Sequence, residues 1–120
     1  MSRTTVERRS HARFPHRFEI EGPAGEGGTI ARMVSRDLSL GGLQCSSSHD
    51  YPEMTRLAVR LHLPGDQETD PINVESVVVR RRALDGSSGS DRYELALFFT
   101  SMSDACRERI ARFLARTASN

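Results

Sequence analysis

Short runs in which apolar and polar residues alternate recur along the chain from residue 17 to residue 99. In a β-strand, a period of two places the apolar side chains on one face and the polar side chains on the other. Loops rich in glycine, proline and serine separate the runs, and strand follows strand, which favours an antiparallel meander or barrel over alternating strands and helices. The expected strands cover residues 17–21, 29–39, 43–46, 56–63, 72–84 and 93–99.

Two polar residues stand out near the end of the strand expected at 29–39. Asp37 and Ser39 would project from one face, while the leucines that alternate with them project from the other face into a core. The polar face is therefore a candidate surface for a ligand. Taken by itself, the pattern also fits side chains that hydrogen-bond to a nearby turn.

The same strand carries two irregular features. Its apolar register changes between Ile30 and Met33, which predicts a bulge or bend at that point. Gly41 and Gly42 then separate it from the next strand, and they fit a primed hairpin turn because glycine reaches the positive φ angles that such turns need. Before any other motif is considered, a plain turn is the favoured role of this pair.

After residue 100 the apolar residues recur with the period of a helix. Ile110, Phe113 and Leu114 lie on one side of an amphipathic helix predicted at 103–117, with Ser103 as its N-cap. Packing of this stripe over one opening of a small barrel is favoured over partner binding. The residues therefore predict a mainly β fold, with six strands in an antiparallel meander or barrel and a C-terminal α-helix.

The 120 residues have the length of one domain, which we expect at residues 14–117. Residues 1–13 lack apolar periodicity, so they are expected to form a flexible N-terminal tail. Residues 1–18 contain five arginines and one acid, a local charge of 5 − 1 = +4, whereas the whole chain carries +1. All 17 basic residues are arginine, which supplies planar, bidentate donors.

Several functional classes receive no support from the sequence. Cys45 and Cys106 lie far apart and form no metal-ligand pattern, and the four histidines show no metal-binding spacing or adjacent nucleophile. We therefore expect neither a metal site nor an enzyme. No apolar run approaches the length of a membrane helix, and no signal peptide is evident, so a cytoplasmic protein without a membrane span is expected.

Two motifs combine with the strand pattern. The first is Arg8-Arg9-x-x-x-Arg13, and the second, further along the chain, is Asp37-x-Ser39-x-x-Gly42. In their order, their spacing and the strands around them, they resemble the PilZ domain family across essentially the whole chain. The resemblance implies a small, six-stranded antiparallel β-barrel with a C-terminal α-helix. It also implies binding of the bacterial second messenger cyclic di-GMP, with the arginine motif in a flexible N-terminal segment and the second motif on the barrel surface.

The residue types suit the ligand that the resemblance implies. Arg9 and Arg13 would meet its phosphate oxygens or the guanine O6 and N7 atoms bidentately. The carboxylate of Asp37 would accept hydrogen bonds from guanine N1 and N2 and so distinguish guanine from adenine. Ser39 would donate to a phosphate or bind through water, and Gly42 would let the backbone approach the ligand.

Further positions bear on this resemblance. Arg8 directly precedes the motif, which in this family tends to accompany binding of a stacked ligand dimer, so two stacked cyclic di-GMP molecules are expected. Family members often have glycine where this chain has Ala96, a departure that concerns local packing more than binding. The run 80–82 consists of three arginines without a family role, and a solvated strand end is its favoured interpretation.

The expected function is a stand-alone cyclic di-GMP receptor whose tail becomes ordered on the ligand and which signals to an unidentified downstream protein. The alternative is a PilZ-like interaction module in motility or polysaccharide machinery that binds no nucleotide, and the complete motifs weigh against it. An RNA-binding barrel ranks last, because the sequence lacks the interleaved aromatics of a stacking platform. No nucleic-acid partner and no cofactor are expected.

Overall fold

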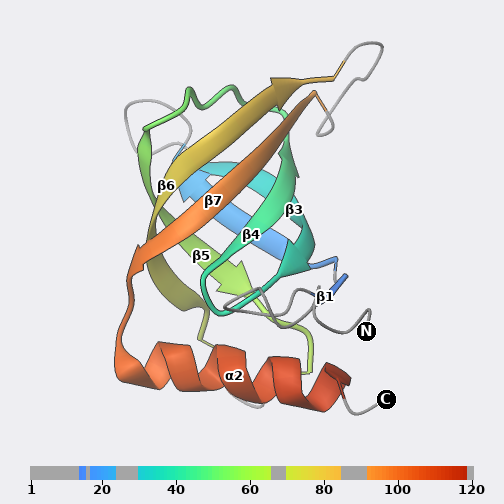
Figure 1. Ribbon diagram of the computed structural model, residues 1–120, viewed down its shortest axis with the longest axis vertical. Coiled ribbons are helices and arrows are strands. Elements are labelled where there is room, and N and C mark those ends of the chain that lie inside the picture. Colours follow the sequence, from blue (N-terminus) through green and yellow to red (C-terminus); the bar gives the residue numbers. More distant parts are fainter. Residues whose placement is uncertain (1–13, 16, 24–29, 66–69, 85–91, 119–120) are drawn as a thin grey trace, which may run out of the picture.

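Seven strands and one helix make up the part of the chain that the computed structural model describes, namely residues 14–15, 17–23, 30–65, 70–84 and 92–118 (Figure 1). Their bounds are β1 (Phe14–Pro15), β2 (Glu19–Pro23), β3 (Ile30–Leu38), β4 (Gly42–Ser47), β5 (Arg56–His62), β6 (Ile72–Ala83), β7 (Tyr93–Ser101) and α2 (Asp104–Ala118). The six predicted strands and the predicted helix are confirmed, with small differences at their ends. The short strand β1 was not predicted.

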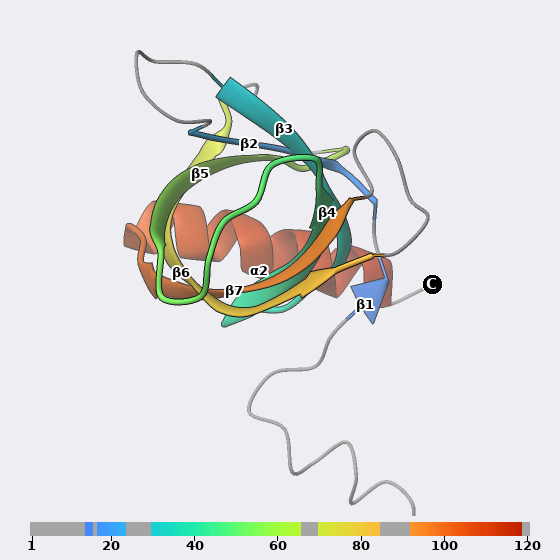
Figure 2. The same ribbon diagram turned by 90° about the horizontal axis from the view of Figure 1, so that it is seen from above.

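Six of these strands close into a barrel. They follow one another around the ring in the order β3-β2-β5-β6-β7-β4, and a further pairing between β3 and β4 closes it. Every one of these pairings is antiparallel, which confirms the predicted six-stranded antiparallel barrel (Figure 2). β1 is not part of this ring. It pairs with Asp37 and Leu38 of β3. In a ring of six, β5 lies opposite β4.

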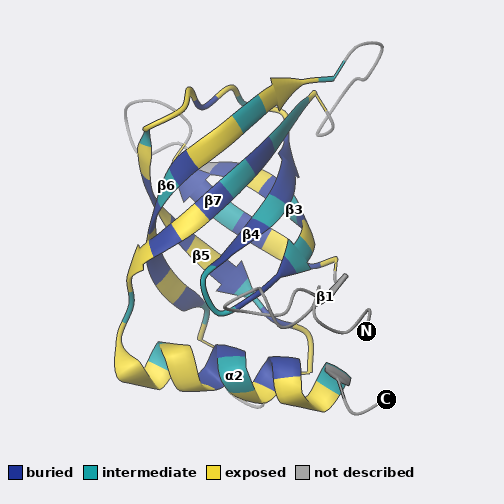
Figure 3. Cartoon of the chain, viewed as in Figure 1, coloured by how far each residue is buried: buried dark blue, intermediate teal, exposed yellow. Residues whose placement is uncertain are grey.

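Buried residues alternate with more exposed ones along much of strands β2 to β7 (Figure 3), and the buried apolar side chains form one core. In β5, for example, Leu57, Val59 and Leu61 are buried while the residues between them are exposed. Burial of such a side chain stabilises the fold by about 1.5–3 kcal/mol. The largest fully buried side chains of the strands are Ile20, Met33, Leu38, Leu43, Leu61, Ile72, Leu95 and Leu97.

Helix α2 lies across one end of the barrel (Figure 1). Its buried stripe contains Ile110, Phe113 and Leu114, and the Phe113 ring meets the Phe18 ring edge-on at 6.2 Å between centroids. The Ser103 hydroxyl accepts a hydrogen bond from the Cys106 backbone N–H, which confirms the predicted cap. Within the described part of the chain, no helix combines the length and apolar character that crossing a bilayer requires.

The irregularity in β3 lies at a different place from the predicted one. β2 and β3 pair without interruption from Ile30 to Val34, so the expected bulge between Ile30 and Met33 is wrong. The register shifts instead between Ser35 and Asp37 in the pairing with β4. The physical reason is that Met33 and Ser35 face the interior before this point and Leu38 faces it afterwards, a change of phase that requires one additional residue.

The turn between β3 and β4 also differs from the prediction. Neither Gly41 nor Gly42 has a positive φ, so a primed hairpin turn is wrong. Gly42 is instead the first residue of β4, and its carbonyl accepts a hydrogen bond from the Ser39 N–H at 2.9 Å. A Cβ atom at Gly42 would lie 2.2 Å from the Leu97 carbonyl oxygen. Glycine is therefore required by the close approach of β4 to β7.

Candidate functional site

β1 lies next to the first residues of the second motif. Phe14 pairs with Leu38, and Pro15 pairs with Asp37, although the two segments are far apart in sequence. Arg13 is the residue that precedes β1, and the extended chain between Arg9 and Phe14 spans at most about 18 Å. Arg8, Arg9 and Arg13 themselves lie outside the described residues.

The β3 bulge determines how Asp37 is presented. Because the interior positions on either side of it are Ser35 and Leu38, the bulge leaves both Arg36 and Asp37 on the outer surface. Arg36 is exposed and Asp37 is half-buried. One carboxylate oxygen of Asp37, Oδ1, accepts a hydrogen bond from the Gln44 backbone N–H at 3.2 Å. This contact with β4 orients the carboxylate on the barrel surface.

Ser39 and Gly42 belong to the turn. Ser39 lies beyond the end of β3 and is only 2% exposed, so the expectation that it shares a polar face with Asp37 is wrong. Its hydroxyl donates to the Gly42 carbonyl and accepts from the Gly41 N–H, each at 3.2 Å. These contacts hold the hairpin together. Roles for Ser39 and Gly42 toward a ligand stay predictions.

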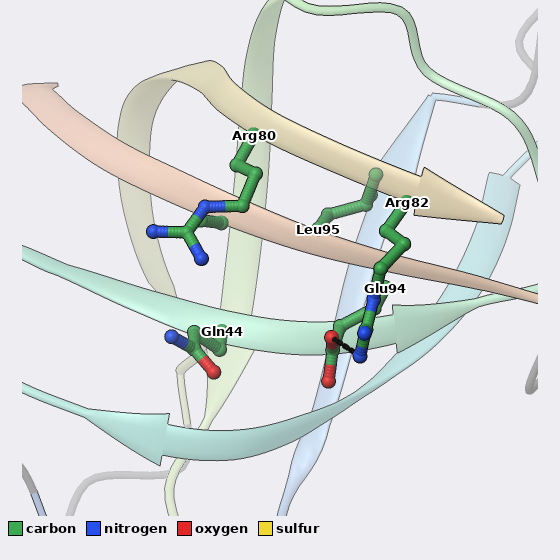
Figure 4. Close-up of a pocket in the computed structure, with 6 residues that line it drawn as sticks. Gln44, Arg80, Arg82, Glu94 and Leu95 are labelled. Atoms are coloured by element: carbon green, nitrogen blue, oxygen red, sulfur yellow. Dashed lines mark hydrogen bonds and ion pairs between the residues drawn. The ribbon is translucent and has the colours of Figure 1, made fainter. Parts of the chain in front are cut away.

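A row of residues crosses four neighbouring strands at the level of Asp37. Asp37 on β3 pairs with Gln44 on β4, Gln44 pairs with Ala96 on β7, and Ala96 pairs with Arg80 on β6. A shallow pocket opens on this outer face (Figure 4). Its lining residues are Gln44, Arg80, Arg82, Glu94, Leu95 and Ala96.

Carboxylates neutralise several arginines around this pocket. Glu94 lies between Arg36, at 3.6 Å, and Arg82, at 2.5 Å. Arg81 points elsewhere and binds Asp50 through two hydrogen bonds of 2.6 and 2.8 Å. The hydrogen bond from Arg81 lowers the pKa of the Asp50 carboxyl, and the same bond raises the pKa of Arg81.

Arg80 differs from its two neighbours in β6. Among the described residues, none forms an ion pair or a side-chain hydrogen bond with the Arg80 guanidinium. Figure 4 shows this side chain extending from β6 across β7 in the direction of Gln44. The run 80–82 is therefore not one uniform solvated strand end, since two of its members have carboxylate partners.

Sequence reasoning missed Gln44, Glu94 and the position of Arg80. Asp37 and Gln44 are paired by the hairpin between β3 and β4. A correct prediction of the turn in this hairpin would therefore have predicted the pairing as well. The row beyond Gln44 depends on pairings between strands that are not neighbours along the chain or are joined by a long loop, and no local signal reveals these.

The described residues offer little to metal or nucleophile chemistry. No group of three or more histidine, cysteine or acidic side chains among them is arranged to hold a metal ion. Cys45 is completely buried, and burial, with a smaller contribution from the Glu94 charge, raises the pKa of its thiol to about 12. This thiol therefore stays protonated at neutral pH.

Comparisons with known proteins place this geometry in context. The family model described as "PilZ domain" matches residues 7–116. Among solved structures, the PilZ domain of YcgR from Escherichia coli with c-di-GMP is 18% identical, with a TM-score of 0.66, and the match covers 92% of this chain and 94% of that chain. Among curated proteins, none matches the chain significantly.

Two longer proteins contain a similar barrel. The inhibitor of motility MotI from Bacillus subtilis is 18% identical with a TM-score of 0.76, over 94% of this chain and 52% of MotI. MrkH of K. pneumonia, in its complex with c-di-GMP, is 19% identical with a TM-score of 0.73, over 92% of this chain and 52% of MrkH. The chain thus spans about half the length of these two relatives. At such identities, the likeness shows a shared fold.

Proposed function

The chain belongs to the PilZ domain family, and from this premise we propose that it is a receptor for cyclic di-GMP. The dinucleotide binds between the arginine segment, through Arg9 and Arg13, and the outer face of the barrel at Asp37. The protein catalyses no reaction in this proposal, since PilZ domains are ligand-binding modules. Two structures with a similar barrel, those of YcgR and MrkH, contain c-di-GMP, which supports the choice of ligand.

The observation that carries this proposal is the pairing of β1 with β3. Because Pro15 lies opposite Asp37, the chain that follows Arg13 runs beside the strand that carries the second motif. The two residues that directly follow the first motif therefore lie beside Asp37 and Leu38 of β3. This favours a single divided site over two unrelated functions.

The arginine segment and Asp37 offer complementary chemistry to the ligand. Asp37, oriented by the Gln44 N–H, accepts hydrogen bonds from guanine N1 and N2, a pair of donors that adenine does not offer. The arginines supply planar forks that match phosphate oxygens and the O6 and N7 edge of guanine. Ser39 and Gly42 contribute chiefly by fixing the hairpin that ends the Asp37 strand.

Binding of this kind provides a route for signalling. Fixing a residue of the tail costs about 1–2 kcal/mol of conformational entropy, while each hydrogen bond to a charged group returns about 1.5–3 kcal/mol. A few arginine contacts therefore suffice to order a short segment on the ligand. The altered surface would then be read by a downstream protein. Arg8, directly before the motif, favours two stacked ligand molecules per chain.

Isothermal titration calorimetry with cyclic di-GMP tests the proposal. We expect a micromolar or lower Kd for the wild-type protein, and at least a tenfold weakening in Arg13→Ala and in Asp37→Ala. Arg60→Ala is the matched control for Arg13→Ala, because it also removes one positive charge. Arg60 lies on β5, on the opposite side of the ring from β4. No binding by the wild-type protein would overturn the proposal and favour a protein-interaction module.

Two details of the proposal are measured in the same titrations. Equal affinities for cyclic di-AMP and cyclic di-GMP would contradict the role given to Asp37. A fitted stoichiometry of one ligand per chain would contradict the stacked pair while leaving the receptor function intact.

A further inference from the structure

We infer that this chain binds a second copy of itself about a two-fold axis, through the outer face of β6 and β7. The centre of this face is an apolar patch, defined as Met54, Val77, Val79 and Phe98. β6 and β7 cross the front of the barrel in Figure 3, with their exposed positions in yellow. This pairing of two copies needs no cyclic di-GMP, so it goes beyond the proposed function and stands or falls separately from it.

Exposed apolar side chains are concentrated in this patch. Among the described residues, the large hydrophobic side chains that are exposed are Met54, Val79 and Phe98, each of them by more than half. Phe98 on β7 pairs with Val77 on β6, and Val79 lies two residues further along β6, at the register shift that follows Val78. The outward side chains of these two strands are therefore neighbours. Single exposed apolar residues are ordinary on a protein surface, whereas a cluster of them marks an interaction site.

The backbone at Met54 gives a second reason to regard the patch as functional. Its φ is 74°, in the left-handed region, and Met54 is the one described residue other than glycine with a positive φ. A hydrogen bond of 2.7 Å from its N–H to the Val78 carbonyl holds it beside β6. Glycine adopts this conformation at less cost, and an exposed methionine adds little to the core. The Met54 side chain therefore contributes apolar surface rather than stability.

A hollow on the same face gives the patch a self-complementary shape. Its volume is about 610 Å³, and its lining residues include Met54, Val77 and Thr100. Val77 pairs with Phe98, so the exposed Phe98 side chain borders the hollow. In a two-fold pairing, each copy inserts the same element into the same place on the other copy. Phe98 of each copy thus fills the hollow of the other, and both apolar patches are removed from water.

The charges at the hollow match a second copy of the chain. Arg56 on β5 and Glu75 on β6 are both exposed, and both line the hollow. Among the described residues, none forms an ion pair or a side-chain hydrogen bond with either of these two side chains. A two-fold axis places Arg56 of each copy against Glu75 of the other, which gives two equal ion pairs beside the apolar centre. A face with a single sign of charge would instead repel its own copy.

Analytical ultracentrifugation of the full chain without ligand tests the inference. The wild-type protein should change from monomer to dimer as its concentration rises, with a Kd on the order of 10–100 μM. Phe98→Thr, which keeps a good strand former on β7, should raise this Kd at least about tenfold. Met54→Gly should also raise it without lowering the melting temperature, because glycine accepts the positive φ. A wild-type protein that stays monomeric at about 1 mM, or variants that dimerise like wild type, would overturn the inference.

Charge reversal identifies the contacts between the two copies. Arg56→Glu leaves two carboxylates at the hollow and Glu75→Arg leaves two guanidiniums, so each variant alone should stay monomeric where the wild-type protein dimerises, and an equimolar mixture of the two should form heterodimers. Arg32→Glu is the matched control, because it makes the same change of charge on β3, opposite β6 in the ring, and it should dimerise like wild type. A mixture that stays monomeric, or an equal loss in Arg32→Glu, would overturn the inference. Cyclic di-GMP is absent from these measurements, so a negative result leaves the receptor function intact, and a failed calorimetric titration leaves the dimer intact.

Discussion

Gly42 lies where the backbones of β4 and β7 approach closely, and its substitution tests that geometry. In Gly42→Ala the new Cβ would meet a backbone carbonyl at 2.2 Å, so the strands must separate. We expect the free energy of unfolding, measured by urea denaturation, to fall by about 2 kcal/mol or more.

Gly22→Ala is the control for this change. Its Cβ would meet the Met33 side chain at 2.8 Å, but there the nearest atom is the flexible methyl end, which can move aside. The expected loss is below about 1 kcal/mol. If Gly42→Ala were as stable as the wild-type protein, the close approach of β4 to β7 would be contradicted, because the entropic advantage of alanine over glycine in the unfolded chain is only about 0.4–1 kcal/mol.

Glu94 holds negative charge beside the proposed site, where it neutralises Arg36 and Arg82. Glu94→Gln should therefore tighten binding of the anionic ligand. A unit charge about 8 Å away in water contributes roughly 0.5 kcal/mol, which corresponds to at least about a twofold lower Kd by calorimetry.

Glu21→Gln is a closely matched control for Glu94→Gln. Glu21 also lies between two basic side chains, Arg60 and His62, but on the β2 and β5 side of the barrel. Equal affinities for Glu94→Gln and Glu21→Gln would contradict a site near Glu94.

At the level of whole elements, the bulges in β3 and β6 connect the core to the site. Each changes which residues of its strand face the interior, so that Leu38 and Val78 are buried while Asp37 and Arg80 face outward. The alternation that predicts strands cannot place such a bulge by itself. The polar and apolar residues near a bulge fit either phase until the partner strand is known, and this is why the expected position between Ile30 and Met33 was wrong.

Deletion of Arg36 tests the β3 bulge. Without the additional residue, Ser35 and Asp37 would pair with the adjacent Cys45 and Gln44 in regular alternation, so Asp37 would still face outward and Leu38 inward. We therefore expect the deletion to leave the barrel folded, with a loss in free energy of unfolding within about 1 kcal/mol of the loss in Arg36→Ala, measured by chemical denaturation. Arg36→Ala keeps the residue count and loses only exposed contacts, so it should itself cost less than about 1 kcal/mol. A loss of more than about 3 kcal/mol in the deletion alone would contradict this register.

For the molecule as a whole, most of the fold could be predicted from the sequence, but only part of the candidate site could. Period-two alternation was sufficient for the six strands, and the helical period was sufficient for α2 with its buried Phe113. Closure of the strands into a barrel was implied by the family resemblance. β1 is very short and contains a proline, and it pairs with the part of β3 that lies beyond the end of β2. Neither β1 nor the row from Asp37 to Arg80 has a local signature, because both depend on long-range register.

A two-dimensional ¹H–¹⁵N NMR titration of the wild-type protein with cyclic di-GMP tests the central claim most directly, because it locates the ligand on the barrel. The account predicts that the amide signals of the row from Asp37 through Gln44 and Ala96 to Arg80 shift, together with those of residues 8–13. Signals of Glu21 and Arg60, on the β2 and β5 side, should stay in place. Shifts confined to the β2 and β5 side, or no shifts at a saturating ligand concentration, would contradict it.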